Sequence, residues 1–181
     1  MTSIPSDTII FLSRNKETAL WTAEPARRTI ISTSQIPYLF RSTCLRRKYG
    51  AIIVRNDEII STGYNGAPRG RKNCSDLGVC TRETLKIPSG ERYELCRSVH
   101  AEANAIISAS RRDMIGATLY LVGRDAKTNE LLGDAMSCSM CKRHIINAGI
   151  ETVIIRTGTS EYRTIPVSDW IENDDSIFLN L

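Results

Sequence analysis

Residues 117–156 read ATLYLVGRDAKTNELLGDAMSCSMCKRHIINAGIETVIIR, and this stretch decides the fold. Two short apolar runs, 117–122 and 151–156, have the length and β-branched content of buried strands. Between them, residues 138–147 have helical composition and stop before Gly149, and glycine commonly ends helices in the left-handed conformation. This strand–helix–strand order predicts part of a sheet that is covered by helices.

Upstream of this stretch, residues 49–55 and 58–63 predict two strands, and Asn56-Asp57 between them favours a hairpin turn. The alanine-rich segment 101–111 predicts a helix, as does the segment 38–45. A further short helix is expected over 16–22. A hairpin followed by alternating helices and strands predicts a single α/β domain with a mixed sheet.

The length and charge of the chain limit its classes of function. The 181 residues fit one domain over 1–181, with an N-terminal extension at 1–34 and an irregular tail at 157–181 that contains Trp170 and 177–179 as possible anchors. The net charge of +4 suits an anionic small molecule and gives no reason to favour a nucleic-acid partner. No apolar run reaches membrane length, and no basic leader precedes one, so the sequence predicts a cytoplasmic protein.

Two short motifs, each at the start of a predicted helix, predict a zinc site. One is His100-Ala101-Glu102 and the other is Cys138-Ser139-Met140-Cys141. Two cysteines separated by two residues can direct both thiolates at one ion from a helix N-terminus, where free N–H groups favour negative charge. His100 as a third ligand leaves the fourth tetrahedral position to water, which is the pattern of catalytic zinc.

Glu102 is the predicted proton carrier of this site. A carboxylate beside an activated water can take a proton from the water and pass it to a leaving nitrogen. CxxC alone is common, with redox activity or half of a structural zinc site as alternatives, and HxE alone has little weight. Their combination matches the known pattern of zinc deaminases that act on cytosine or adenine.

Four further segments carry a resemblance to one family within those deaminases. They are RSTCLRRKYGAIIV (41–54), ISTGYNGAPRG (60–70), PSGERYELCRSVHAEANAI (88–106) and IINAGI (145–150). Over residues 38–156 the chain resembles the bacterial and phage deoxycytidylate deaminases. The resemblance implies the cytidine-deaminase-like fold, a three-layer α/β/α arrangement with a mixed sheet of about five strands. It also implies zinc-dependent hydrolysis of dCMP to dUMP and ammonia.

The resemblance also assigns roles to single residues. It makes His100, Cys138 and Cys141 the zinc ligands, Glu102 the proton shuttle, and Asn65 the residue that hydrogen-bonds the sugar of a bound nucleotide. In members regulated by dCTP and dTTP, the segment matching 63–70 also belongs to an effector site. Family members are typically homo-oligomers, so the resemblance implies self-association as well.

Basic residues next to the first predicted strand are candidates for binding phosphate. Arg46, Arg47 and Lys48 follow one another directly, and Arg47 in particular could supply charge for a 5′-phosphate. An exposed basic face beside the hairpin is an equally good interpretation.

Four cysteines outside the CxxC motif raise the question of a second, structural zinc. Cys74, Cys80 and Cys96 lie in the long segment 64–97, and Cys44 precedes the first strand. A loop of this length needs something to hold it, and cysteines bound to zinc are one solution. Their spacing is irregular, so buried free cysteines are the alternative.

Three features depart from the family pattern, and rival functions follow from them. Ser137 stands where the family has proline, residues 124–137 form a longer and more polar excursion, and no usual C-terminal helix follows Arg156. The alternatives are a deaminase of another base or nucleoside, including adenosine in tRNA, and a catalytically weak, zinc-stabilised binding module. The segment 60–70 argues against a tRNA adenosine deaminase, and histidine in place of cysteine at position 100 argues against a free-nucleoside cytidine deaminase. Retention of Glu102 argues against the binding module.

Overall fold

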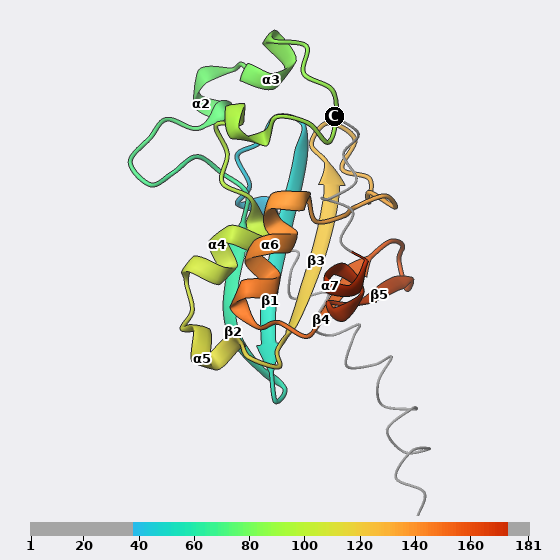
Figure 1. Ribbon diagram of the computed structural model, residues 1–181. Coiled ribbons are helices and arrows are strands. Elements are labelled where there is room, and N and C mark those ends of the chain that lie inside the picture. The colour runs from blue at the N-terminus through green and yellow to red at the C-terminus, as the bar shows by residue number, and fades with distance from the viewer. Residues whose placement is uncertain (1–37, 174–181) are drawn as a thin grey trace, which may run out of the picture.

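The computed structural model describes residues 38–173, and a mixed sheet of five strands forms the centre of this part (Figure 1). The strand order is β2-β1-β3-β4-β5. The strands are β1 (Arg47–Arg55), β2 (Glu58–Tyr64), β3 (Thr118–Asp125), β4 (Thr152–Arg156) and β5 (Tyr162–Pro166). β3 and β4 are parallel, and the other three neighbouring pairs are antiparallel. The predicted α/β class and the mixed sheet of about five strands are therefore confirmed.

The β1–β2 hairpin turns at the predicted dipeptide. Asn56 and Asp57 both have positive φ, 50° and 64°, as two-residue hairpin turns of type I′ require. The central strand β3 is longer than its apolar run because it continues beside the start of β1, where Asp125 pairs with Arg47. This extension brings the residues after β3 close to the mouth of the candidate site.

Helices α4 (Ala101–Ile107) and α6 (Ser139–Ala148) pack on one face of the sheet, with α7 (Ser168–Glu172) beside them (Figure 1). Gly149 ends α6 with φ 80°, as predicted. The larger hydrophobic core lies under these helices and includes Leu119, Leu121, Val153 and Ile155. A smaller cluster on the opposite face contains Ile52, Val54, Tyr120 and Ile154, against which Tyr38 packs.

The contact between α4 and β2 fixes the start of α4. Asn104 Nδ2 donates a 2.7 Å hydrogen bond to the Tyr64 carbonyl, and Ser61 Oγ donates one of 2.8 Å to the Ala105 carbonyl. Gly63 lets the two backbones approach, since a Cβ at this position would lie 2.5 Å from the amide nitrogen of Ala105. The N-terminus of α4, which carries His100, is thereby held against the edge of the sheet.

Two predicted helices differ from the structure, each for a local reason. The helix expected over 38–45 is helical only at 38–40, and Ser42 instead bonds to Asn65. The helix expected over 101–111 is divided into α4 and α5 (Arg111–Met114), because Ser108 Oγ bonds back to the Asn104 carbonyl and Ser110 caps α5. The helix expected over 16–22 lies outside the described residues.

The C-terminal segment contains more structure than predicted. Residues 157–181 were expected to be irregular apart from a possible strand, yet β5 pairs with β4 and α7 follows it. Trp170 packs against the larger core, and Lys142 lies 5.5 Å from its ring centroid. The anchor expected at 177–179 lies outside the described residues.

The long segment between β2 and α4 is an ordered loop that contains three short helical turns. These are α2 (Cys74–Leu77), α3 (Thr81–Thr84) and the 3₁₀ turn η1 (Tyr93–Leu95). An isolated bridge between Gly66 and Val99 closes the loop at its base. We refer to residues 67–98 as the cap loop. Across residues 38–173, no helix has the length and apolar composition that crossing a bilayer requires.

Candidate active site

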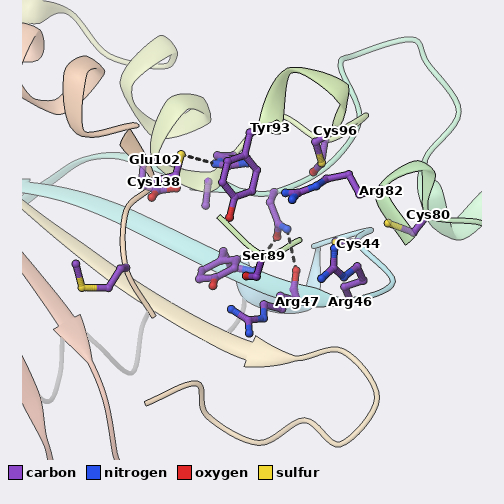
Figure 2. A pocket seen from close by; sticks show the side chains of 16 residues that line it. Cys44, Arg46, Arg47, Cys80, Arg82, Ser89, Tyr93, Cys96, Glu102 and Cys138 are labelled. Atoms are coloured by element: carbon purple, nitrogen blue, oxygen red, sulfur yellow. Dashed lines mark hydrogen bonds between the residues drawn. The ribbon is translucent and has the colours of Figure 1, made fainter. Parts of the chain in front are cut away.

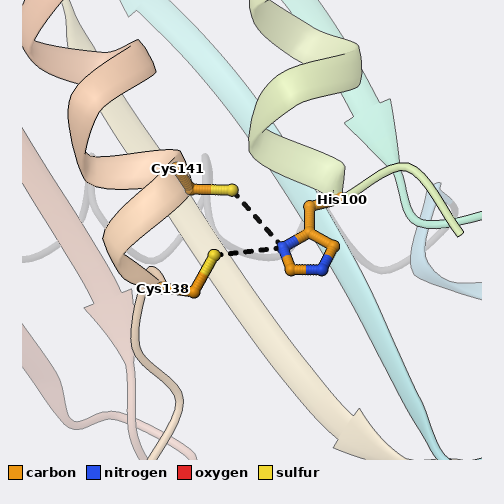
Figure 3. A group of neighbouring side chains, drawn as sticks. All are labelled: His100, Cys138 and Cys141. Atoms are coloured by element: carbon orange, nitrogen blue, oxygen red, sulfur yellow. Dashed lines mark hydrogen bonds between the residues drawn. The ribbon is translucent and has the colours of Figure 1, made fainter. Parts of the chain in front are cut away.

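The predicted zinc ligands meet where the N-termini of α4 and α6 face each other (Figure 3). His100 is the N-cap residue of α4, and Cys138 is the N-cap residue of α6. Cys141 lies in the first turn of α6 and is fully buried. Both sulfurs, Cys138 Sγ and Cys141 Sγ, lie 3.4 Å from His100 Nδ1. We call these three residues, together with Glu102, the zinc corner.

The donor set fits a zinc ion. Tetrahedral zinc with ordinary Zn–N and Zn–S bond lengths separates a nitrogen from a sulfur ligand by about 3.5 Å, close to the two observed distances of 3.4 Å. The three ligand atoms all lie within 4.8 Å of one another. In the described part of the chain, no other group of three His, Cys, Asp or Glu residues meets this criterion. Three protein donors leave one tetrahedral position for water or substrate.

The electrostatics of the metal-free corner favour one thiolate. Hydrogen bonds from Cys141 and His100 lower the pKa of the Cys138 thiol, although burial opposes this. Burial also disfavours a charged His100, but its hydrogen bonds with Cys138 and Cys96 raise the pKa of the imidazole to about 10. The N-terminus of α6 adds to this because its free N–H groups favour negative sulfur.

Glu102 lies directly behind the ligands, with only 4% of its surface exposed. Burial raises the pKa of its carboxyl group above the usual value, which suits a group that must both accept and release a proton. The hydroxyl of Ser137 lies near enough to lower that pKa slightly, and it makes no hydrogen bond of standard geometry within the described residues. The exchange of proline for serine has left the three ligands together.

Tyr93 from the cap loop orients the histidine. Its ring meets the His100 ring edge-on, with centroids 4.9 Å apart and an interplanar angle of 87°. Edge-to-face contacts of this kind stabilise one ring orientation. Tyr93 was not among the predicted site residues, although it lies inside the quoted motif 88–106.

A cavity that is partly open to solvent extends from the zinc corner, with about 740 Å³ of empty space when the open part is included (Figure 2). The β-sheet, the cap loop and the segment before α6 all contribute to its wall. The side chains important below are Arg46, Arg47, Asn65, Arg82, Tyr93 and Glu102.

Asn65 lies in the cavity wall, and its side chain is largely engaged by protein atoms. Its Oδ1 accepts hydrogen bonds from Ser42 Oγ at 2.6 Å and from the Tyr49 amide at 2.8 Å. Its Nδ2 donates to the Arg47 carbonyl at 2.9 Å. Asn65 therefore braces the start of β1 against the end of β2, and one N–H of its amide is left for a ligand.

Two of the predicted basic residues line the cavity, and both have carboxylate partners. Arg47 NH2 lies 3.8 Å from Asp134, and Arg46 Nε lies 3.6 Å from Glu83. Both acids are exposed, with 71% and 55% of their side-chain surface accessible, so these ion pairs are weak and exchangeable. Lys48, the third member of the predicted basic run, is not among the lining residues.

The cysteines of the predicted second zinc site lie near one another but do not form a tight group of ligands. Cys80 and Cys96 line the cavity, as does Cys44, whereas Cys74 is buried behind them. Burial raises the pKa of Cys74, and the neighbouring Cys44, Cys80 and Cys96 raise it further. In residues 38–173 these sulfurs do not come within 4.8 Å of one another in a group of three.

Sequence reasoning missed several lining residues because no local pattern marks them. Arg82, Tyr93 and Met136 belong to segments without a periodic pattern, and Tyr49 was assigned only to a strand. A buried arginine in a polar loop has no local signal. Met136 comes from the excursion 124–137, so this departure from the family pattern does border the cavity.

Comparison with known proteins places this geometry in a family. The model of the cytidine and deoxycytidylate deaminase zinc-binding region matches residues 35–157. A deoxycytidylate deaminase of Mycobacterium phage D29 is 40% identical over 119 residues, which cover 63% of this chain and 81% of the phage protein. That of Schizosaccharomyces pombe is 36% identical over 117 residues, 65% of this chain but only 33% of the yeast protein.

A solved structure agrees with the fold. The apo dCMP deaminase of cyanophage S-TIM5 superposes with a TM-score of 0.51 and 25% identity, covering 73% of this chain and 83% of that one. The family match spans more than half of the chain and includes both motifs of the zinc corner. The chain therefore belongs to the family defined by the cytidine and deoxycytidylate deaminase zinc-binding region.

Proposed function

We propose that this protein is a zinc-dependent hydrolase that converts dCMP and water to dUMP and ammonia. The observation that carries the proposal is the zinc corner, where three donors at zinc spacing adjoin a buried glutamate. A purely structural zinc usually has four protein ligands, and it needs no proton carrier beside it. The relatives named as deoxycytidylate deaminases support the choice of dCMP within this reaction class.

Zinc bound at His100, Cys138 and Cys141 would supply a Lewis acid that makes water nucleophilic near neutral pH. Glu102 takes the proton of the attacking water and delivers it to the amino group that leaves C4 of cytosine. Its burial keeps the carboxyl group away from competing water and raises its pKa, so that it can hold the proton between the two steps. Tyr93 keeps the His100 ring in one orientation.

The rest of the cavity provides groups for the sugar and phosphate of a nucleotide. Asn65 has one amide N–H available, which suits a sugar hydroxyl. Arg47 can exchange its exposed partner Asp134 for a phosphate. The cavity is therefore lined by cations at a distance from the catalytic glutamate, an arrangement that matches a monophosphate better than a free base (Figure 2).

A panel of substrates tests the proposal. Zinc-loaded protein is incubated with dCMP, dCTP, deoxycytidine, cytosine and guanine, and ammonia release is measured for each. We expect dCMP to have the highest kcat/KM. A tRNA adenosine substrate tests the rival deaminase activity, and absence of ammonia from every compound would support the non-enzymatic binding module instead.

Adding dCTP or dTTP to the dCMP assay tests for the effector site that the resemblance predicts at 63–70. Sedimentation of the same protein tests the predicted homo-oligomer.

A second, structural zinc at Cys74, Cys80 and Cys96 is a further part of the proposal. It is supported by the position of Cys44, Cys80 and Cys96, which lie near enough to Cys74 to add to the rise in its pKa that burial causes. Metal analysis decides between one and two zinc ions per chain. A single zinc that is unchanged in the double variant Cys74→Ser/Cys80→Ser would rule the second site out.

A further inference from the structure

Arg82 is a buried cation in the wall of the cavity. It belongs to α3 in the cap loop, and only 4% of its surface is exposed, although the residues around it in the sequence are mostly exposed. Its side chain points into the cavity between Tyr93 and Cys96 (Figure 2). Arginine is almost never fully buried without a partner, so the contacts of this side chain need an explanation.

Among the described residues, Arg82 forms no ion pair; the exposed Glu94 lies near enough for the charge of Arg82 to help lower its pKa, but Glu94 pairs with Arg92. The Nη2 group of Arg82 donates a 2.5 Å hydrogen bond to the Pro88 carbonyl, and its guanidinium carbon lies 4.3 Å from the centroid of the Tyr93 ring. Its Nε is buried and makes no hydrogen bond to any described residue. Within residues 38–173, no carboxylate forms an ion pair with it. Arg46 and Arg47, in the same cavity, each have one.

A buried guanidinium with an unused hydrogen-bond donor is suited to bind an anion. Arginine does not release its proton in proteins, so it cannot relieve the cost of burial by becoming neutral. A neutral carbonyl and an aromatic ring compensate the charge only in part. The planar guanidinium presents several N–H groups in a fixed arrangement, which matches the oxygens of a phosphate.

Tyr93 connects this cation to the zinc corner. One side of the Tyr93 ring carries the Arg82 guanidinium, and the same ring meets the His100 imidazole edge-on. Arg82 and His100 therefore contact the same Tyr93 ring and line the same cavity. A ligand with its base at Glu102 and an anionic group at Arg82 would fill the space between them.

We propose that Arg82 binds the 5′-phosphate of the substrate nucleotide and is the residue that separates nucleotides from nucleosides. This inference rests on the proposed function, because it assumes that the base is processed at the zinc corner. It assigns the phosphate to a residue of the cap loop and leaves the half-buried Arg47 a secondary role. The competing explanation is a structural one, in which Arg82 only ties α3 to Pro88 and Tyr93.

The test compares two substrates in the variants Arg82→Gln and Arg82→Lys. The value of kcat/KM is measured for dCMP and for deoxycytidine, with zinc-loaded protein. We expect Arg82→Gln to lower the value for dCMP about 10- to 100-fold, as loss of a charge-assisted hydrogen bond implies, and to leave that for deoxycytidine unchanged. Arg82→Lys keeps the charge and should recover part of the loss. The matched control is Arg71→Gln, which changes an exposed arginine of the same loop.

If Arg82 has only a structural role, Arg82→Gln should lower kcat/KM equally for dCMP and for deoxycytidine. That result, or no loss of kcat/KM at all, overturns the inference. If wild-type protein deaminates neither compound, the proposed function fails on its own, and binding then decides the role of Arg82. Calorimetric titration with dUMP and with deoxyuridine should show that Arg82→Gln weakens the binding of dUMP about 10- to 100-fold and leaves the binding of deoxyuridine unchanged. Absence of dUMP binding to the wild type, or binding that does not depend on residue 82, overturns the inference as well. Should Arg82→Gln not fold, Arg82→Lys tests the inference through a smaller loss in kcat/KM for dCMP with no loss for deoxycytidine, and an equal change for both substrates overturns it.

Discussion

The zinc corner and the cap loop form two walls of one cavity, but they are stabilised in different ways. The zinc corner is built from two helix N-termini that regular elements hold in place, and its ligands converge at 3.4 Å. The cap loop has no core of its own, and single contacts such as Arg82 with Pro88 and Arg97 with the Lys72 carbonyl hold it. We call the zinc corner the rigid wall and the cap loop the loop wall. We infer that the rigid wall performs the chemistry and that the loop wall selects the substrate.

The largest expected effect comes from removing the proton carrier of the rigid wall. Glu102→Gln preserves size but cannot accept a proton, so kcat should fall by about 10²- to 10⁴-fold. Zinc content should remain unchanged, because Glu102 is not one of the three ligands. Ammonia release and metal analysis on the same preparation measure both effects. The control Glu151→Gln changes an exposed glutamate far from the cavity; loss of zinc from Glu102→Gln would contradict the assigned roles.

The difference between the two walls explains what the sequence could reveal. His100, Glu102, Cys138 and Cys141 lie at the starts of two helices, and their match to the known pattern of zinc deaminases was enough to predict that they meet. Asn65 was predicted from the family motif to hydrogen-bond the sugar of a nucleotide; it lies in the cavity wall, and its role toward the sugar stays a prediction.

The parts that sequence reasoning could not supply depend on contacts between distant segments. Arg82 and Tyr93 come together only because the cap loop folds back on itself, and no periodic pattern marks such a contact. The break between α4 and α5 depends on serine side chains that compete with the backbone of a helix-favouring segment. The strand β5 is largely exposed and polar, so local composition does not reveal its pairing with the predicted strand β4.

The second prediction concerns the pH dependence of zinc binding in the rigid wall. In the metal-free protein the pKa of His100 is raised to about 10, and that of Cys141 is raised above its ordinary value. Both groups are therefore protonated at pH 7, whereas zinc binds neutral imidazole and thiolate. Binding should release two protons, so that lowering the pH by one unit weakens zinc affinity about 100-fold.

Competition with a chromophoric chelator between pH 6 and pH 8 measures this slope. Calorimetry in buffers of different ionisation enthalpy counts the released protons directly. The variant Glu151→Gln should keep the slope, since it changes an exposed glutamate outside the zinc corner. An affinity that does not change with pH would contradict the protonation states assigned to His100 and Cys141.

The third prediction concerns the support of the rigid wall. A Cβ at residue 63 would overlap the Ala101 carbonyl oxygen and lie 2.5 Å from the Ala105 amide nitrogen. Gly63→Ala must push α4 away from β2, and we expect it to lower the free energy of unfolding by about 1–3 kcal/mol. Zinc affinity should fall too, because α4 carries His100.

Urea unfolding and zinc competition measure these two effects of Gly63→Ala. The matched control is Gly133→Ala, where the new Cβ would meet nothing nearer than the Thr157 carbonyl at 3.7 Å. Equal stabilities of the two variants would show that the approach of α4 to β2 does not hold the zinc corner in place.

The smallest effect is expected in the cap loop. Asn73 Oδ1 accepts a 3.0 Å hydrogen bond from Thr43 Oγ1, which ties the start of α2 to the segment before β1. Asn73→Ala removes this bond at a partly buried position, and we expect a loss of about 0.5–1.5 kcal/mol in the free energy of unfolding. Zinc affinity should not change, because the regular elements that carry the ligands are untouched.

Urea unfolding and zinc competition measure the stability and the zinc affinity of Asn73→Ala, and the variant Arg71→Ala, at an exposed residue, is the control. Together they show whether a change in the cap loop reaches the zinc corner. A fall in zinc affinity to match that of Gly63→Ala would mean that the cap loop and the zinc corner are stabilised as one unit. In that case the loop could not adjust to a substrate without disturbing the metal ligands. Independent behaviour instead leaves the loop free to change its contacts with the nucleotide while the chemistry stays fixed.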